Sequence, residues 1–513
     1  MKNKIEILFI FFVLVIFTIV FAKYYYPELY SYTVRGSENS IRMNLDYLKY
    51  KVTLFKDTKI NLADANNNDY AKSVPVLNYH GIANTPYKND ILIDNFAEQM
   101  VSLKEAGYTT VTLEEFYAFM RNEKPLPDKS VLITFDDGIK SSYYKSDPLF
   151  RALDYNAVIF LISKQSTGAG SNYYLSKDEV NDMIDTGRWE IQAHANGSHD
   201  LINIDLSGRR GHFMSDKIWS DDLQRLETDE EFEKRIYHEL SATKGSLEQA
   251  FNLKVNSFAF PFGDFGQISI NHPGAKDYVL PTALRVYPDG IFYQVWANKG
   301  ATDNYPVDAH EKAFKRITVQ PSWDGKDLID ILKNSHAKDL PFSDNFDYNK
   351  GWISVSGDRA IGNNLMVLKP LSSNSTFVFL DGSYLFKDYT FKAKIEPFRG
   401  ETVSLIARFK DDTNYVSCDF AQKVVRIREY NNGNTTVIAE VRSDSYIPHL
   451  NSELGVAVNN NNVECSVNGE KIIEAANLNN EIKNGAVGFK TWDTVNDAQL
   501  IVREVIVEQI DSS

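Results

Sequence analysis

The pattern of apolar and polar positions divides the chain into two regions of different texture. Between residues 74 and 341, short apolar runs alternate with stretches whose apolar residues recur at helical spacing. This alternation predicts an α/β domain built from βα units around a parallel sheet. The predicted strands cover 74–80, 107–111, 131–135, 157–161, 189–193 and 255–260, and the predicted helices cover 93–105, 113–122, 177–186 and 228–251.

The helical pattern stops near Pro341, and a second domain is expected over residues 342–513. Short β-rich runs follow at roughly ten-residue spacing, separated by turn residues, which is typical of an all-β sandwich. One pair of runs flanks Asn468-Gly469, a strong hairpin signal.

The N-terminus carries a membrane signal. Lys2 and Lys4 precede the apolar residues 7–22, and Lys23 with three tyrosines follows. With its flanks, this run approaches the ~20 residues that span a bilayer. Residues 1–23 therefore read as a transmembrane signal-anchor, or as a signal peptide cleaved after Ala22. Either reading places the remaining chain outside the cytoplasm, as a single-pass membrane protein or a secreted one, with residues 24–73 as a tether.

Composition limits the classes of binding partner and metal site that are expected. The 513 residues include 55 basic and 69 acidic side chains, for a net charge of −14, and no basic stripe is visible. Nucleic acid is therefore not expected as a partner. Cys418 and Cys465 are the only cysteines, too few for a cysteine-based zinc site. Both fall in predicted strands, where they either form a disulfide or stay buried and free.

The first candidate for chemistry is Asp136-Asp137-Gly138, which follows the apolar strand 131–135. Functional groups of a parallel α/β domain gather at the carboxyl ends of its strands. Two adjacent carboxylates there can place a metal ligand beside a general base. The alternative is an acidic turn, since Asp and Gly are common turn residues.

Two histidines supply a second candidate. His194 and His199 follow the predicted strand that ends at Ala193, and their spacing of five suits a loop rather than one helical face. Together with an aspartate they would suit Zn²⁺ or a similar transition metal. Downstream, Pro261-Phe262-Gly263 follows an apolar strand and forms a rigid turn that can aim a backbone N–H into a pocket.

These elements, in this order, resemble the motifs of polysaccharide deacetylases of the NodB-homology class, carbohydrate esterase family 4. The resemblance covers about residues 74–335, and its three motifs correspond to 134–138, the pair His194 and His199, and 260–263. It implies a distorted (β/α) barrel over 74–341. It also implies a hydrolase that removes acetyl groups from a polysaccharide containing N-acetylhexosamine.

The resemblance also implies residue roles. Asp136 would act as general base, while Asp137, His194 and His199 would hold a divalent metal, Zn²⁺ in the first place and Co²⁺ or Ni²⁺ otherwise. That ion would activate a water and polarise the acetamide carbonyl. The backbone N–H of Phe262 would help to stabilise the oxyanion.

Three departures from the family pattern stand out. The family often has an arginine in the third motif, where this chain has Ala259. The histidines are five apart instead of four. Gln320 stands near the usual position of a late histidine that acts as general acid, so His80, at the tip of the first strand, and more weakly His310 become candidates for that role.

The longer histidine spacing and the missing arginine resemble the branch that deacetylates poly-β-1,6-N-acetylglucosamine exopolysaccharides. Peptidoglycan or an O-acetylated glycan remains an alternative substrate, and a non-catalytic glycan-binding protein an alternative function. Residues 205–230 look like an insertion that either shapes a glycan groove or forms a solvated loop. The second domain resembles concanavalin-like jelly rolls, which implies either a carbohydrate-binding domain or a purely structural one.

Overall fold

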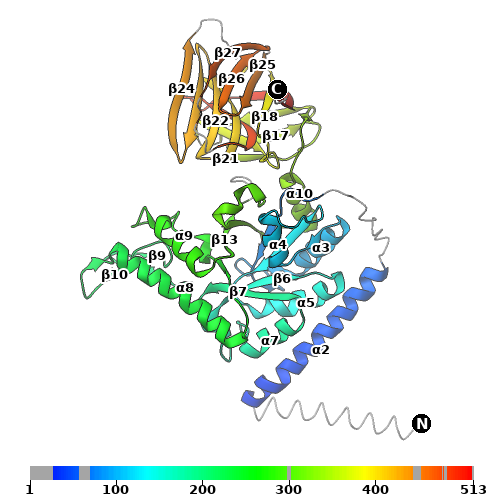
Figure 1. Ribbon diagram of the computed structural model, residues 1–513. Helices are drawn as coiled ribbons and strands as arrows, with labels where there is room; N and C mark the ends of the chain where they lie inside the picture. Colours follow the sequence, from blue (N-terminus) through cyan, green and yellow to red (C-terminus); the bar gives the residue numbers. More distant parts are fainter. Residues whose placement is uncertain are drawn as a thin grey trace.

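The computed structural model describes residues 27–56, 70–296, 302–371, 373–442, 452–476, 478 and 482–510. The predicted anchor, residues 1–23, lies outside the described residues. Among the helices of the described ranges, none is both long and apolar enough to cross a bilayer. Figure 1 shows a barrel domain in the lower half of the view and a β-domain above it.

The first domain is a closed parallel barrel. Seven strands pair in the ring order β1, β14, β13, β12, β7, β6, β5, and β5 returns to β1. A short eighth strand, β4, pairs with the start of β5. The strands are β1 (Val76–Tyr79), β4 (Thr109–Thr110), β5 (Ser130–Phe135), β6 (Ala157–Ile162), β7 (Trp189–Ala195), β12 (Ser257–Ala259), β13 (Gly290–Val295) and β14 (Ala313–Thr318). The predicted α/β barrel is therefore confirmed.

Helices cover the outside of this barrel (Figure 1). Their starts follow from local sequence: Thr112, Ser176 and Thr228 each form a capping box with a glutamate three residues later. The helices are α3 (Ile93–Glu105), α4 (Leu113–Met120), α5 (Lys140–Leu153), α6 (Ser163–Ser166), α7 (Lys177–Asp185), α8 (Asp229–Phe251), α9 (Ala275–Val286) and α10 (Gly325–Ser335). Apolar helix faces and strand faces share one buried cluster that includes Phe96, Phe135 and Trp189.

The segment expected to be a tether contains α2 (Pro27–Lys56), which runs beside α5 (Figure 1). Arg151 of α5 stacks its guanidinium over the ring of Tyr47 at 4.0 Å and donates a hydrogen bond to Asn44 at 3.1 Å. Residues 27–56 of this segment thus form a helix that packs against the barrel rather than a linker.

The second domain is a sandwich of two antiparallel sheets, as the strand spacing predicted. One sheet has the order β16 (Trp352–Ser356), β19 (Ser375–Leu380), β28 (Ala486–Trp492), β21 (Thr402–Asp411), β22 (Asn414–Ala421), β23 (Val424–Asn431) and β24 (Asn434–Arg442). The other has the order β17 (Asp358–Gly362), β18 (Leu365–Lys369), β29 (Leu500–Gln509), β20 (Tyr389–Ile395), β25 (Ser452–Asn459), β26 (Asn462–Val467) and β27 (Glu470–Ala475), with β15 (Phe342–Asp344) beside β29.

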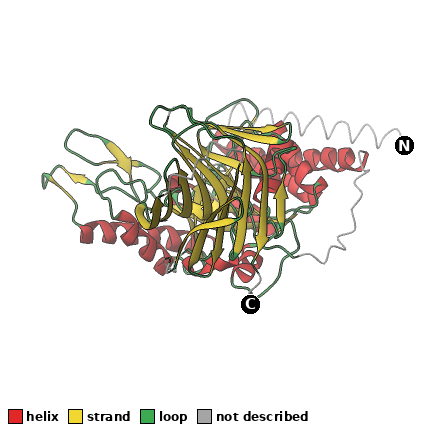
Figure 2. Cartoon of the chain, turned by 90° about the horizontal axis from the view of Figure 1, so that it is seen from above, coloured by secondary structure: helices red, strands yellow, loops and turns green. Residues whose placement is uncertain are grey.

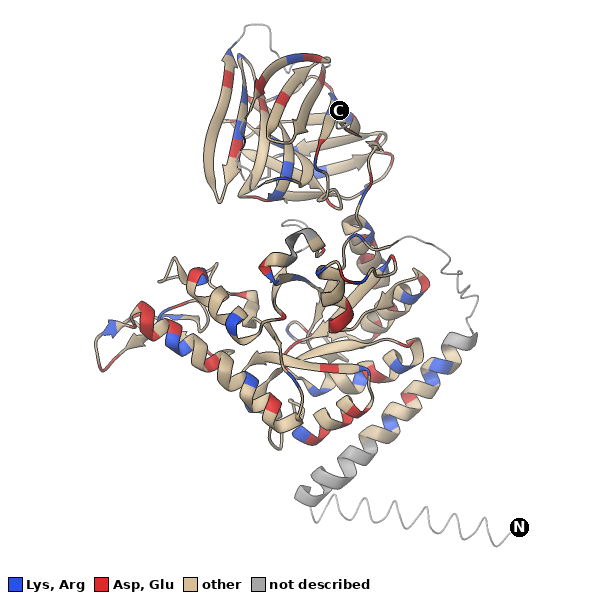
Figure 3. Cartoon of the chain, viewed as in Figure 1, with Lys and Arg blue, Asp and Glu red and all other residues tan. Residues whose placement is uncertain are grey.

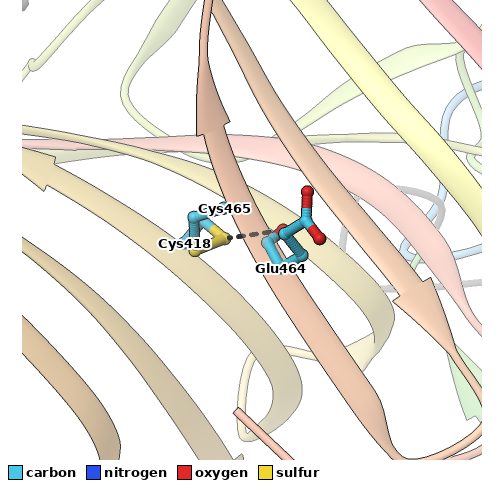
Figure 4. Close-up of a disulfide and its surroundings, with 3 residues drawn as sticks. All are labelled: Cys418, Glu464 and Cys465. Carbon is cyan, nitrogen blue, oxygen red and sulfur yellow. Dashed lines mark hydrogen bonds between the residues drawn. A yellow bond between two sulfur atoms is a disulfide. The ribbon is translucent and has the colours of Figure 1, made fainter. Parts of the chain in front are cut away.

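A disulfide joins the two sheets. Cys418 of β22 and Cys465 of β26 are bonded across the buried layer, where a sulfur also lies 3.7 Å from the carbonyl oxygen of Glu464 (Figure 4). Of the two states that the sequence left open, the structure has the bonded one. Phe391 and Phe489, from opposite sheets, pack at 5.4 Å in the same layer.

Two hairpins project from the barrel between β7 and α8. They consist of β8 (Leu201–Asn203) with β9 (Arg210–His212) and β10 (Trp219–Ser220) with β11 (Arg225–Leu226). Figure 2 shows them extending to one side of the molecule. Lys and Arg alternate with Asp and Glu along the neighbouring α8, so both signs of charge mix there (Figure 3).

Candidate metal centre and active site

The two adjacent aspartates lie where β5 leaves the barrel. The Asp136 N–H still donates to the carbonyl of Tyr79 at 3.0 Å, which continues the β1–β5 pairing by one residue. Asp137 then adopts a left-handed φ of 71°, and Gly138 follows with φ 75°. Asp and Gly both tolerate this left-handed conformation, in which the chain leaves the strand. As a result the two carboxylates have different partners.

Asp136 is fully buried and paired with Arg316 of β14. The guanidinium donates from Nη1 to Oδ1 at 2.6 Å and from Nη2 to Oδ2 at 2.8 Å. Burial raises the pKa of Asp136, but Arg316 and then His194 outweigh it, so the pKa lies below its ordinary value. The carboxylate is therefore ionised and held in one orientation.

Arg316 was not found from the sequence. Within β14 it directly follows another cation, Lys315, so the local sequence does not indicate which of the two faces the barrel interior. Inside the barrel, Nη1 also lies 3.2 Å from Oδ1 of Asn78 and 3.3 Å from the Thr134 hydroxyl. The cation expected at Ala259 therefore enters from a different strand, because closure of the ring brings β14 and β5 to either side of β1.

Asp137, His194 and His199 converge on one point, with candidate ligand atoms within 4.8 Å of one another. Oδ1 of Asp137 lies 3.3 Å from Nε2 of His194 and 3.2 Å from Nε2 of His199. His194 Nδ1 lies 2.8 Å from the carbonyl oxygen of Ala259, so Nδ1 carries the hydrogen donated to that oxygen and Nε2 is the ring atom that faces the carboxylate.

These three side chains fit a divalent metal. Oδ1 of Asp137 is buried, and among the described residues it makes no hydrogen bond of good geometry. A divalent cation held between this oxygen and the two Nε2 atoms would give all three a partner, in a site of two imidazoles and one carboxylate. The carbonyl of Ala259 orients His194 in the way that outer partners orient metal-binding imidazoles.

His194 lies within β7, which corrects the prediction that both histidines follow the strand. The β6–β7 register shifts between Leu161 and Ile162, whose partners are Ala193 and Ala195. His194 is the extra residue of this β-bulge, which aims its side chain toward Asp137. Hydrophobic pattern alone does not reveal a bulge.

The loop that carries His199 is held by α8. Oε1 of the buried Glu239 accepts hydrogen bonds from the backbone N–H groups of Asn196, Gly197 and Ser198, each at 2.8 Å. Three donors converging on one carboxylate oxygen fix the loop conformation just before His199. The sequence offered no signal for this contact, because Glu239 is one acidic residue among many on α8.

Phe262 lies in a single 3-10 turn, Pro261–Gly263, with a left-handed φ of 60°. Its ring centre is 4.8 Å from that of His199 and stacks on His212 at 4.5 Å with an interplanar angle of 8°. His212 Nδ1 lies 2.6 Å from the buried carboxylate of Asp264, and this hydrogen bond raises the pKa of His212. The insertion over 205–230 therefore contacts Phe262, whose backbone N–H was predicted to stabilise the oxyanion.

His80 directly follows β1, and its proximity is one of the smaller causes that lower the pKa values of Asp136 and Asp137. Asp90 accepts a hydrogen bond from the adjacent Gly81 N–H at 3.2 Å. The structure thus places His80 beside the other candidates. His310 is different: its side chain is 75% exposed and faces Glu311 at 4.0 Å.

Comparisons with known proteins point to the same family as the motifs. A family model described as polysaccharide deacetylase matches residues 123–277. The chain is 24% identical over 330 residues to a poly-β-1,6-N-acetyl-D-glucosamine N-deacetylase of Escherichia coli strain K12, covering 60% of this chain and 46% of that protein. A protein of the same name from Staphylococcus epidermidis is 29% identical over 174 residues, covering 30% of this chain and 58% of that protein.

The chain thus spans about half the length of the first of these relatives. A solved de-N-acetylase from Aggregatibacter actinomycetemcomitans superposes with a TM-score of 0.44 at 19% identity, covering 50% of this chain and 99% of that one. The family match includes Asp136, Asp137, His194, His199 and Phe262. The resemblance inferred from the motifs is therefore confirmed, and the chain contains a polysaccharide deacetylase domain of the NodB-homology class.

Proposed function

We propose that this protein is a metal-dependent hydrolase that removes N-acetyl groups from a poly-N-acetylglucosamine-like polysaccharide. The observation that carries the proposal is that two adjacent aspartates have different surroundings. Asp136 is ionised and clamped by Arg316, while Asp137 faces two imidazoles with an unpaired oxygen. The names of the E. coli and S. epidermidis relatives support an N-acetylglucosamine polymer as substrate.

Each residue has one task in this proposal. Asp137, His194 and His199 hold the metal, for which Zn²⁺ is the best match and Co²⁺ or Ni²⁺ are alternatives. The bound ion lowers the pKa of a water and polarises the acetamide carbonyl.

Asp136 accepts the proton of the attacking water, and the Phe262 N–H donates to the developing oxyanion. His80 donates a proton to the sugar nitrogen as the C–N bond breaks. The products are acetate and a free amine.

The cellular setting is also a proposal. Residues 1–23 would anchor the chain in the cell membrane, or be cleaved, and the catalytic domain would lie outside the cytoplasm. The Cys418–Cys465 bond supports an oxidising compartment. The sandwich would be a concanavalin-like jelly roll that binds carbohydrate. Exposed aromatic side chains such as Trp492 support that role.

The proposal is tested by acetate release from N-acetylglucosamine oligomers, using the full chain reloaded with Zn²⁺. Activity should disappear after chelation and in Asp136→Asn, which keeps the shape of the side chain but cannot accept the proton. Undiminished release by Asp136→Asn would overturn the assigned base. Release only from muropeptides or acetylated xylan would move the substrate to those glycans.

A further inference from the structure

A cavity of about 490 Å³ lies between the barrel and the sandwich. The barrel contributes Trp296, Thr318, Gln320 and Trp323, and the sandwich contributes Ile353, Ser354 and Arg359. These seven residues line the space that we call the interdomain cavity. Its walls come from both domains, so neither domain alone forms it.

The interdomain cavity adjoins the catalytic centre. Thr318 is the last residue of β14 and lies two positions beyond Arg316, which corresponds to about 7 Å along the strand on the same face. The following residue, Val319, donates its N–H to the carbonyl of Asn78 at 3.2 Å, two residues before His80. The cavity therefore opens at the same carboxyl rim of the barrel as the proposed active site.

The lining suits a neutral sugar. Trp296 is 53% exposed, and its indole offers a flat apolar surface of the kind that packs on a pyranose face. Gln320 provides an amide, and Arg359 provides a planar set of donors. None of the seven lining residues is a carboxylate.

Arg359 is the residue that points most strongly to a ligand. Its Nε and Nη1 are buried, and neither has a hydrogen-bond partner among the described residues. Thr318, on the opposite wall, has a buried hydroxyl that also lacks a hydrogen-bond partner among the described residues. Buried donors without partners are costly, and a ligand rich in hydroxyl and carbonyl oxygens would satisfy them.

The domain junction holds the two walls in place. Tyr305 of the barrel stacks on Tyr384 of the sandwich at 4.7 Å with an interplanar angle of 28°. Lys338, just after α10, donates its N–H to the carbonyl of Gly382 at 2.8 Å and its Nζ to the carbonyl of Asn334 at 2.9 Å. These contacts make the sandwich a fixed wall rather than a module on a free hinge.

We propose that the interdomain cavity is a subsite for an N-acetylated sugar next to the reacting unit of the polymer, completed by Arg359 of the sandwich. The inference rests on the proposed function and explains how the same site recognises the sugar next to the reacting unit. A neutral acetamide offers a carbonyl acceptor to Arg359. A deacetylated unit carries an ammonium group, which the guanidinium repels, so the subsite favours substrate over product.

The test measures binding without turnover. The Zn²⁺-loaded full chain with Asp136→Asn is titrated calorimetrically with the N-acetylglucosamine monosaccharide, its tetramer and the fully deacetylated tetramer. Trp296→Ala and Arg359→Gln are compared with two controls, Tyr348→Ala and Arg399→Gln, and Trp492→Ala is measured separately as a probe of the sandwich surface. The two control residues belong to the sandwich, have 61% and 60% exposure, and lie outside the cavity lining. Unchanged thermal unfolding midpoints establish that the variants fold.

Each cavity variant should weaken tetramer binding by about tenfold, leave monosaccharide binding unchanged, and differ from both controls. The acetylated tetramer should bind more tightly than the deacetylated one, and Arg359→Gln should reduce this difference in affinity. Parent-like tetramer binding in both cavity variants would overturn the subsite. So would a loss confined to Trp492→Ala, which would place the polymer on the sandwich surface around this exposed tryptophan.

Acetate release separates the two proposals. If the Zn²⁺-loaded chain without Asp136→Asn binds the tetramer in this cavity but releases no acetate, deacetylation is refuted and the subsite stands. If acetate is released and Trp296→Ala and Arg359→Gln leave kcat/KM for the tetramer unchanged, the subsite is refuted and deacetylation stands.

Discussion

Arg316 and Asp136 form a two-pronged ion pair inside the barrel, with N–O distances of 2.6 and 2.8 Å and both side chains fully buried. The pair joins β14 to the end of β5 across the intervening β1. It gives the proposed base a fixed orientation, and it supplies the arginine that the third motif lacks at Ala259.

Arg316→Ala should therefore impair both stability and activity. Removing one partner of a buried pair leaves an uncompensated charge and costs about 3–5 kcal/mol of unfolding free energy. Arg316→Lys should retain more stability but lose the paired geometry, with a fall in kcat of about 10²-fold. Denaturant titration and acetate release measure the two effects. Arg399→Ala, at an exposed site, is the control, and equal stability of Arg316→Ala and this control would contradict the assigned pair.

Metal content provides a test that does not depend on activity. His199→Ala and Asp137→Ala each remove one of the three proposed ligands, so both should bind well under one equivalent of Zn²⁺ by elemental analysis after dialysis. His310→Ala is the matched control, because this histidine is 75% exposed and lies outside the ligand group. Full metal occupancy in the Asp137 variant would show that the three residues do not form the metal centre.

Glu239 acts through the loop rather than on the metal. Glu239→Ala removes the acceptor of three backbone hydrogen bonds before His199, so metal affinity should fall about 10–100-fold, the range found when outer partners are lost. Competition with a chromogenic chelator measures the affinity. Glu230→Ala changes an exposed acid on the same helix and should have no effect. Equal affinities of the two variants would disprove the positioning role.

Asp381, at the domain junction, predicts a pH dependence of stability. Burial raises its pKa to about 7. Between its ordinary value and 7, the unfolded chain is ionised while the folded chain stays protonated. Stability should therefore fall as pH rises through this window, by at most about 1.4 kcal/mol per pH unit, and stay level above it. Burial also lowers the pKa of Lys338 to about 8, so measurements should end near pH 7.

Asp381→Asn keeps the acceptor for the Gly382 N–H and removes the titration. Its thermal unfolding midpoint should vary less between pH 5 and 7 than that of the unaltered chain. Asp412→Asn, at an exposed position, should follow the unaltered chain. A parallel pH response of the Asp381 and Asp412 variants would rule out Asp381 as the titrating group.

The sequence pattern was sufficient to predict those helices that are specified by neighbouring residues along the chain. Residues 93–105 are helical with the predicted bounds, and local capping boxes at Thr112 and Thr228 begin two further helices close to their predicted starts. Some predictions missed by a few residues: β7 extends to Ala195 and includes His194, because a bulge depends on the partner strand. Helices α5, α9 and α10 were not predicted. Two of them contain an internal proline, which interrupts the usual signal.

The sequence by itself determined the candidate ligands and base, because Asp136, Asp137, His194, His199 and Phe262 belong to short motifs at strand ends. Only the tertiary structure decided what surrounds them. Barrel closure brings Arg316 to Asp136, a helix brings Glu239 to the His199 loop, and the insertion brings His212 onto Phe262. These contacts join residues 41 to 180 positions apart, and no local pattern encodes a partner at such a distance.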